Sequence, residues 1–248
     1  MKIGYQLYSA LELCQTEQGL RDTICKIAQM GYDGVEFFSY VDMSAAQVRQ
    51  LLADNGIEGL NAHVQLSQWQ TSLDEEIEYA VQAGVPMITI PYIAPADRTA
   101  ELYSSLRQSL PAWVEKCKKN GIKACYHNHE FEYETIDGQL VLDIFAQASP
   151  LLYFELDTFW AMYAGLDPVA ELEKRKNQLG AVHIKDYLNK TTSPPTFCAV
   201  GHGKMDVCSI IEKSKQLDID WLVVEQDNSQ IDALESAKLS LDFIRQYL

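Results

Sequence analysis

The stretch Asn120–Glu132, NGIKACYHNHEFE, joins a helix-ending turn to a short apolar strand and then to a cluster of polar side chains. Its glycine, Gly121, can adopt the left-handed backbone conformation that closes a helix, so this turn marks a passage from helix to strand. Two histidines, one asparagine and two glutamates lie within the eight residues Cys125–Glu132. No other stretch of the chain is as rich in groups that can do chemistry, so its place in the fold matters most.

The passage from helix to strand recurs along the chain. A glycine followed by an apolar residue and a strand-like run stands at Gly31, Gly56, Gly84, Gly121 and Gly180. Between the strand-like runs, apolar residues recur with the spacing of amphipathic helices, about 3.6 residues. The sequence predicts eight strands: Ile3–Leu7, Gly34–Phe38, Gly59–Val64, Met87–Ile90, Lys123–His127, Leu152–Asp157, Ala181–Lys185 and Trp221–Glu225.

This alternation of strand and helix predicts parallel strands joined by right-handed crossovers, and eight such units can close into a (β/α)8 TIM barrel. The 248 residues contain no linker-like break in composition, so we expect one α/β domain over residues 1–248. An open doubly wound sheet is the alternative. The segment after the first strand, Tyr5–Ser9, lacks the glycine-rich phosphate-binding motif typical of such sheets, which favours the barrel.

The composition excludes several classes of partner. A formal net charge of −15 argues against nucleic acid and anionic membrane as main partners, because both attract basic patches. No run approaches the roughly 18 apolar residues of a membrane span. The six cysteines form no CxxC pair, and the N-terminus opens directly into a strand, so we expect reduced thiols and a cytoplasmic protein. The oligomeric state stays open, with a homo-oligomer among the alternatives.

Metal-capable side chains stand at the ends of most predicted strands. In a barrel these ends meet at one mouth, where active sites lie. Residues two apart on a strand share a face, so His127 with His129, and His183 with Lys185, are expected to point the same way. Such a mixture of imidazole and carboxylate groups suits one divalent ion, Mn, Mg, Co or Zn. The residues concerned are Glu36, His63, His127, His129, Glu155, Asp157, His183, Lys185 and Glu225.

Each candidate also has a purely structural interpretation. A single histidine in a strand, such as His63, is often a hydrogen-bonded structural residue. Asp157 can cap the turn that follows it, and Trp160 can simply pack in the core. The long segment Tyr187–Met205 is interpreted either as a loop over the site or as a mobile surface excursion.

Five segments together resemble the xylose isomerase-like TIM barrel superfamily, the sugar phosphate isomerases/epimerases. They are YHNHEFEY (126–133), ELDTFWAMYAGLDP (155–168), VHIKDY (182–187), VGHGKMD (200–206) and VVEQD (223–227). The resemblance implies a metal shell of Asp157, His183 and Glu225. Many relatives have Glu on strand five, where this chain has His127-Asn128-His129, so His127 is assigned to the fourth ligand position and His129 to the substrate side, with the reverse left open.

The resemblance also implies a divalent-metal-dependent isomerase or epimerase that acts on a sugar or keto-sugar through a metal-stabilised enediolate. Glu225 is the expected base, and Lys185 or Glu132 would return the proton. The substrate, a small-molecule sugar, would contact side chains around the mouth: Glu36, His63, His129, Trp160 and His202.

Three other functions remain as alternatives. The first is a sugar or inosose dehydratase, a lyase that shares the first proton abstraction. The second is an abasic-site endonuclease of the same fold, which the charge of −15 disfavours. The third is a non-catalytic sugar-binding protein.

Overall fold

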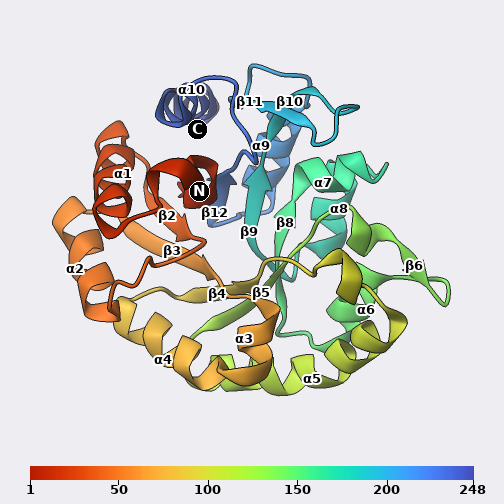
Figure 1. The fold of residues 1–248 in the computed structure, drawn as a ribbon. Coiled ribbons are helices and arrows are strands. Elements are labelled where there is room, and N and C mark those ends of the chain that lie inside the picture. Colours follow the sequence, from red (N-terminus) through yellow and green to blue (C-terminus); the bar gives the residue numbers. More distant parts are fainter.

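In the computed structural model, which describes residues 1–248, eight parallel strands close into a barrel surrounded by helices (Figure 1). Their order around the barrel is β1-β12-β9-β8-β5-β4-β3-β2. The predicted TIM barrel is therefore confirmed, and every predicted strand is present within two residues of its expected bounds. The barrel strands are β1 (Lys2–Gln6), β2 (Gly34–Phe37), β3 (Glu58–His63), β4 (Met87–Ile90), β5 (Lys123–His127), β8 (Tyr153–Asp157), β9 (Leu179–Ile184) and β12 (Trp221–Val224).

The helices cover the outside of the barrel (Figure 1). They are α1 (Glu17–Met30), α2 (Ala45–Asn55), α3 (Leu66–Thr71), α4 (Leu73–Ala83), α5 (Ala100–Lys119), α6 (Val141–Ala148), α7 (Thr158–Tyr163), α8 (Pro168–Arg175), α9 (Val207–Gln216) and α10 (Ala233–Arg245), with short 3-10 helices η1 (Leu7–Leu13), η2 (Pro95–Asp97) and η3 (Phe131–Tyr133). None of the helices combines the length and apolar character needed to cross a bilayer.

Four of the five predicted glycine turns are confirmed. Gly31, Gly56, Gly84 and Gly121 have φ values of 99°, 61°, 78° and 75°, the left-handed conformation that ends a helix. The prediction for Gly180 is wrong, because this residue lies inside β9. A Cβ at Gly180 would lie 2.8 Å from Sγ of Cys125, so a close approach of strands, and not a turn, requires glycine there.

The two ends of the barrel interior differ in polarity. Six buried residues form an apolar cluster there, which we call the barrel floor: Leu60, Met87, Cys125, Ala181, Trp221 and Val223. The Trp221 ring fits because Gly34 has no side chain, since a Cβ at Gly34 would lie 2.7 Å from the ring. Polar side chains from the carboxyl ends of the same strands occupy the other half of the interior.

The segment after β9, for which a loop over the site and a mobile surface excursion were both left open, contains a hairpin anchored by Asp186. Strands β10 (Asp186–Asn189) and β11 (Thr196–Cys198) pair antiparallel. The Asp186 carboxylate then accepts hydrogen bonds from the backbone N–H groups of Gly201, Gly203 and Met205, at 3.0, 2.8 and 2.9 Å. A second small hairpin, β6 (Thr135–Ile136) with β7 (Gln139–Leu140), precedes α6.

Candidate active site

A cavity of about 370 Å³ opens at the carboxyl ends of the barrel strands. Because parallel strands of a barrel all end at the same mouth, side chains far apart in the sequence meet here. The lining residues are Tyr8, Phe38, His63, Gln65, Pro91, Tyr92, His127, His129, Glu225 and Asp227. Four residues predicted from strand ends, His63, His127, His129 and Glu225, thus share one cavity.

The four side chains expected to bind a metal also converge. One nitrogen or oxygen atom from each of His127, Asp157, His183 and Glu225 lies within 4.8 Å of the others, and all four residues are buried. The Nδ1 of His183 is 2.7 Å from Oε2 of Glu225, and the Nε2 of His127 is 4.0 Å from Oδ2 of Asp157. We call these four residues the ligand set. Each comes from a different strand end, so only the closed barrel assembles them.

Lys185 lies among the carboxylates of this region. Its Nζ is 3.1 Å from Asp157, 2.9 Å from Glu225 and 2.7 Å from Asp227, and the side chain is 1% exposed. Burial alone would lower the pKa of Lys185, but these three carboxylates outweigh it and raise the pKa well above its ordinary value. Lys185 therefore carries a fixed positive charge beside Glu225.

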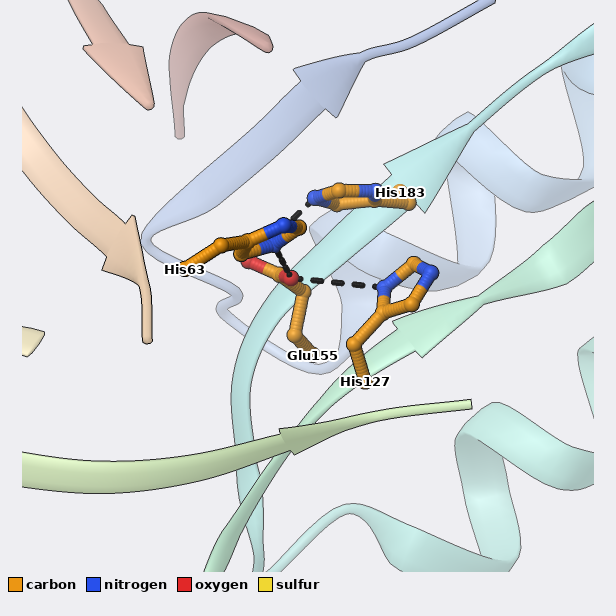
Figure 2. A group of neighbouring side chains, drawn as sticks. All are labelled: His63, His127, Glu155 and His183. Carbon is orange, nitrogen blue, oxygen red and sulfur yellow. Dashed lines mark hydrogen bonds and ion pairs between the residues drawn. The ribbon is translucent and has the colours of Figure 1, made fainter. Parts of the chain in front are cut away.

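A second group of side chains surrounds Glu155 deeper in the barrel (Figure 2). Oε2 of Glu155 is 2.8 Å from Nε2 of His63 and 3.3 Å from Nδ1 of His127, and Oε1 is 3.2 Å from Nε2 of His183. We call His63, His127, Glu155 and His183 the Glu155 cluster. Its atoms also meet the distance criterion for a metal site, so the barrel holds two overlapping groups that share His127 and His183.

Further buried polar groups hold the Glu155 cluster in place. Asn61 donates from Nδ2 to Glu155 Oε1 at 2.7 Å and to Glu36 Oε2 at 3.0 Å. Gln6 donates to the other oxygen of Glu36. Glu36 was expected to contact substrate, but it is fully buried and does not line the cavity. Glu36 lies behind His63 and His183 and supports them: the Nε2 atoms of these histidines lie 3.1 and 3.0 Å from Oε1 of Glu36.

The carboxylates set the protonation of the histidines. Burial disfavours a charged His63, but Glu36 and Glu155 outweigh this effect and raise its pKa to about 10. The pKa of His183 is also raised well above its ordinary value, because Glu155, Glu36 and Glu225 outweigh burial. Conversely, Lys185 and His183 overcome the effect of burial on Glu225 and hold its pKa well below the usual range.

The ligand set fits a divalent cation. Two imidazoles and two carboxylates are a donor combination that Zn²⁺, Mn²⁺ and Co²⁺ accept. All four donor side chains are buried and converge, and two buried carboxylates side by side are costly unless positive charge lies close to them.

Asp157 serves two purposes at once. Its Oδ1 accepts a hydrogen bond from the N–H of Trp160 at 2.9 Å and so caps α7, as the structural interpretation predicted. Its Oδ2 faces the ligand set and lies 3.1 Å from Nζ of Lys185. Trp160 itself is 8% exposed and packs against Phe159 and His129, so the structure places it in the wall behind the cavity and not on its lining.

His129 lines the cavity and lies between the rings of Tyr92 and Trp160. Burial, together with the neighbouring His127 and Lys185, lowers its pKa well below the ordinary value. A neutral His129 can therefore donate or accept a hydrogen bond from the cavity wall, and its Nδ1 has no protein partner.

Two predicted residues are not brought to the cavity. Glu132 accepts a hydrogen bond from the Tyr126 hydroxyl at 2.6 Å and one from the backbone N–H of His129 at 2.7 Å. Since the Tyr126 ring packs against Phe145 of α6, the Glu132 carboxylate lies in the layer between strands and helices. His202 is exposed in the Gly201–Gly203 turn and does not line the cavity.

Asp227 received no role from the sequence. It lines the cavity and pairs with Lys185, and the signal for it was its spacing, two residues after Glu225. Glu155 was counted among the metal-capable strand ends, but the sequence did not indicate its three histidine neighbours.

Comparisons with known proteins show which family and fold the chain shares. A model of the xylose isomerase-like TIM barrel family matches residues 24–247. The inosose dehydratase of Geobacillus kaustophilus (strain HTA426) is 24% identical over 266 aligned residues, which cover 89% of this chain and 85% of the relative. Among solved structures, a sugar phosphate isomerase/epimerase from Parabacteroides distasonis ATCC 8503 superposes with a TM-score of 0.78 at 22% identity, over 98% of this chain and 93% of that chain. The IolI protein with a bound zinc atom superposes with a TM-score of 0.79 at 16% identity, over 100% and 99% of the two chains.

Proposed function

Because the chain belongs to the xylose isomerase-like TIM barrel family, as its motifs predicted, we propose that it is a divalent-metal-dependent enzyme that isomerises or epimerises a sugar or keto-sugar. The observation that carries the proposal is the convergence of four buried donor side chains, those of His127, Asp157, His183 and Glu225. The likeness to a sugar phosphate isomerase/epimerase and to a zinc-containing protein of the same fold supports it.

The ligand set would hold the cation beside the cavity, since His127 and Glu225 belong to both. A bound divalent cation would supply Lewis-acid polarisation of a substrate carbonyl and stabilise the charge of an enediolate. The cation also balances the negative charge of Asp157 and Glu225, which Lys185 balances only in part.

Glu225 is proposed as the base that removes the proton next to the carbonyl. Its contacts with His183 and Lys185 both involve Oε2, so Oε1 is the atom for the substrate proton. The low pKa of Glu225 keeps the carboxylate ionised near neutral pH. In this scheme Lys185 keeps Glu225 ionised and does not itself transfer a proton. The Lys185 ammonium is held by three carboxylates and does not line the cavity.

His63 is proposed to return the proton in place of Glu132. It lines the cavity, and its raised pKa, to about 10, means that it is protonated and can donate. Glu132 faces the outer layer of the barrel and cannot reach the same space. His129, neutral and on the cavity wall, is assigned to a substrate hydroxyl.

A dehydratase is the second candidate, and it shares the first proton abstraction with the isomerase or epimerase. The two carboxylates on the lining, Glu225 and Asp227, both follow β12, whereas His63 and His127 come from β3 and β5. In a dehydratase, the acid that faces the base across the cavity would protonate a departing hydroxyl group instead of the carbon. The inosose dehydratase relative supports the same alternative.

The test begins with metal analysis of the purified protein, followed by incubation with Mn²⁺, Co²⁺ or Zn²⁺ and a panel of ketoses in D₂O. Proton NMR should show deuterium at the carbon next to the carbonyl. Exchange without loss of water identifies an isomerase or epimerase, and an ultraviolet-absorbing enone identifies a dehydratase.

The matched control is Glu171→Gln, which changes a buried glutamate that pairs with Arg175 at 3.1 Å and lies outside the site. This variant should keep its exchange activity, whereas Glu225→Gln should lose it. A wild-type protein that binds the cation but exchanges no deuterium with any ketose would contradict both candidate functions.

A further inference from the structure

The two histidines shared by the ligand set and the Glu155 cluster each face Glu155 with one ring nitrogen and a carboxylate of the ligand set with the other; Nε2 of His183 also lies 3.0 Å from Oε1 of Glu36. His183 points Nδ1 at Glu225, 2.7 Å away, and Nε2 at Oε1 of Glu155, 3.2 Å away. His127 points Nε2 at Asp157, 4.0 Å away, and Nδ1 at Oε2 of Glu155, 3.3 Å away. Glu155 is thus the one carboxylate that faces both rings from behind (Figure 2).

A neutral imidazole carries one N–H, so the nitrogen that binds a metal must be the one without hydrogen. The other nitrogen then donates, and a carboxylate at that position fixes the tautomer and the ring orientation. The geometry predicts different tautomers for the two rings: N–H at Nε2 of His183 and at Nδ1 of His127.

Glu155 is suited to this task because it is buried and held by neighbouring polar groups. It is fully buried, its Oε1 accepts from Asn61 at 2.7 Å, and its Oε2 lies 2.8 Å from Nε2 of His63. A buried carboxylate is costly unless donors surround it, so Glu155 requires N–H groups from the neighbouring rings.

We propose that Glu155 is a positioning residue that turns Nδ1 of His183 and Nε2 of His127 toward the metal. The inference rests on the proposed function only in that it requires a cation in the ligand set. Glu155 does not line the cavity and would not touch the substrate.

The competing arrangement makes Glu155 itself a ligand, together with His63, His127 and His183, whose atoms also lie within 4.8 Å of one another. That arrangement uses the opposite nitrogens, Nε2 of His183 and Nδ1 of His127. We favour the ligand set because both oxygens of Glu155 already have close partners, Asn61 at 2.7 Å and His63 at 2.8 Å, whereas the contacts of Glu225 with His183 and Lys185 use only its Oε2.

Nitrogen NMR distinguishes the two arrangements. The chain has only five histidines, so a long-range ¹H–¹⁵N correlation spectrum of the protein labelled with ¹⁵N-histidine and loaded with Zn²⁺ resolves each ring. The expected result is zinc on Nδ1 of His183 and on Nε2 of His127, with N–H on the other nitrogen of each ring and no zinc on His63. Zinc on Nε2 of His183, on Nδ1 of His127 and on His63 would overturn the proposal and make Glu155 a ligand.

Glu155→Gln provides the second measurement, with Glu171→Gln as the matched buried control. Without the carboxylate that faces both rings, zinc affinity measured by calorimetry should fall about 10- to 100-fold, and the tautomers of His127 and His183 should change. The Glu171→Gln control should keep the wild-type affinity and tautomers. Unchanged affinity and tautomers in Glu155→Gln would refute a positioning role. If wild-type protein binds no zinc at all, the proposed function fails too, whereas reversed tautomers would overturn the inference alone.

Discussion

Replacing Lys185 by methionine tests the electrostatics of the whole site, because one ammonium group faces Asp157, Glu225 and Asp227. Lys185 is 1% exposed, and Asp157 and Glu225 are buried as well. Methionine keeps most of the side-chain volume but removes the charge. Buried carboxylates then remain without their cation.

Removing one partner from a buried ion pair costs about 3–5 kcal/mol. For a chain of 248 residues each kcal/mol lowers the Tm by about 2–4 °C, so the metal-free Lys185→Met protein should melt about 6–20 °C below the wild type. Divalent cation should restore part of this difference, because it neutralises the same carboxylates, and occupancy at 100 times the Kd contributes about 2.7 kcal/mol.

The assay is thermal unfolding by circular dichroism with and without Mn²⁺. Lys116→Met is the control, since Lys116 pairs with Asp74 at 2.9 Å on the surface, where 44% of its side chain is exposed, and such pairs contribute about 0–1 kcal/mol. A Tm for Lys185→Met within 2–3 °C of the control would refute the reasoning, a margin set by about 1 kcal/mol. It would mean that the three carboxylates do not depend on the ammonium.

Three further predictions concern single residues. Glu225→Gln should lower kcat/KM for deuterium exchange by about 10²- to 10⁴-fold with unchanged circular dichroism, because a general base is lost; an active variant would exclude Glu225 as the base. Burial raises the pKa of Glu132 from 4.5 to about 8, so the folded state holds a proton that the unfolded chain has released, and stability should fall as pH rises between these values. Glu132→Gln should flatten that fall, measured as the urea midpoint at pH 5 and pH 8, and equal slopes in both proteins would contradict the burial of this carboxyl. Asp186→Ala removes the acceptor of three backbone N–H groups and should speed hydrogen exchange at Gly201, Gly203 and Met205, while the barrel strands stay protected.

The sequence predicts the strands well because their apolar runs are short and end at turns with strong local preferences. Gly31 and Gly121 are examples, since both adopt the left-handed conformation that few other residues accept. Gly180 follows the same sequence pattern but lies in β9, where its missing side chain makes room for Cys125 from a neighbouring part of the barrel. That requirement depends on a contact distant in sequence, which local patterns cannot reveal.

The sequence predicted the site residues that lie on strands, because the two-residue alternation of a strand fixes which side chains point into the barrel. His127, Asp157, His183 and Glu225 each follow the two-residue alternation of a strand into the barrel interior, so their convergence follows once the barrel closes. Glu132 was not predictable in this way, because the 3-10 helix Phe131–Tyr133 intervenes after β5 and carries its carboxylate to the outer layer.

The sequence also did not show how deep in the barrel interior each side chain lies. Glu36 and His63 both stand at strand ends in the sequence, yet only His63 lines the cavity. Two shifts of strand register, between Val35 and Glu36 and between Phe154 and Glu155, alter how far each strand extends into the mouth. Register is decided by pairing between strands, so a single sequence does not specify it.

The distribution of apolar contacts explains how the barrel tolerates so many buried charges. The main core cluster contains 58 buried residues and includes outward-facing strand residues such as Phe37, Tyr126 and Phe154, whereas the apolar cluster inside the barrel contains 6. Stability therefore comes mainly from the layer between strands and helices. The mouth side of the interior can then hold Glu36, Glu155 and their histidine partners at a local electrostatic cost. Substitutions in that polar region should change metal binding and protonation more than they change the fold. Glu155→Gln and Glu171→Gln both replace a buried glutamate, but only Glu155 lies in that region, so only its replacement is expected to lower zinc affinity.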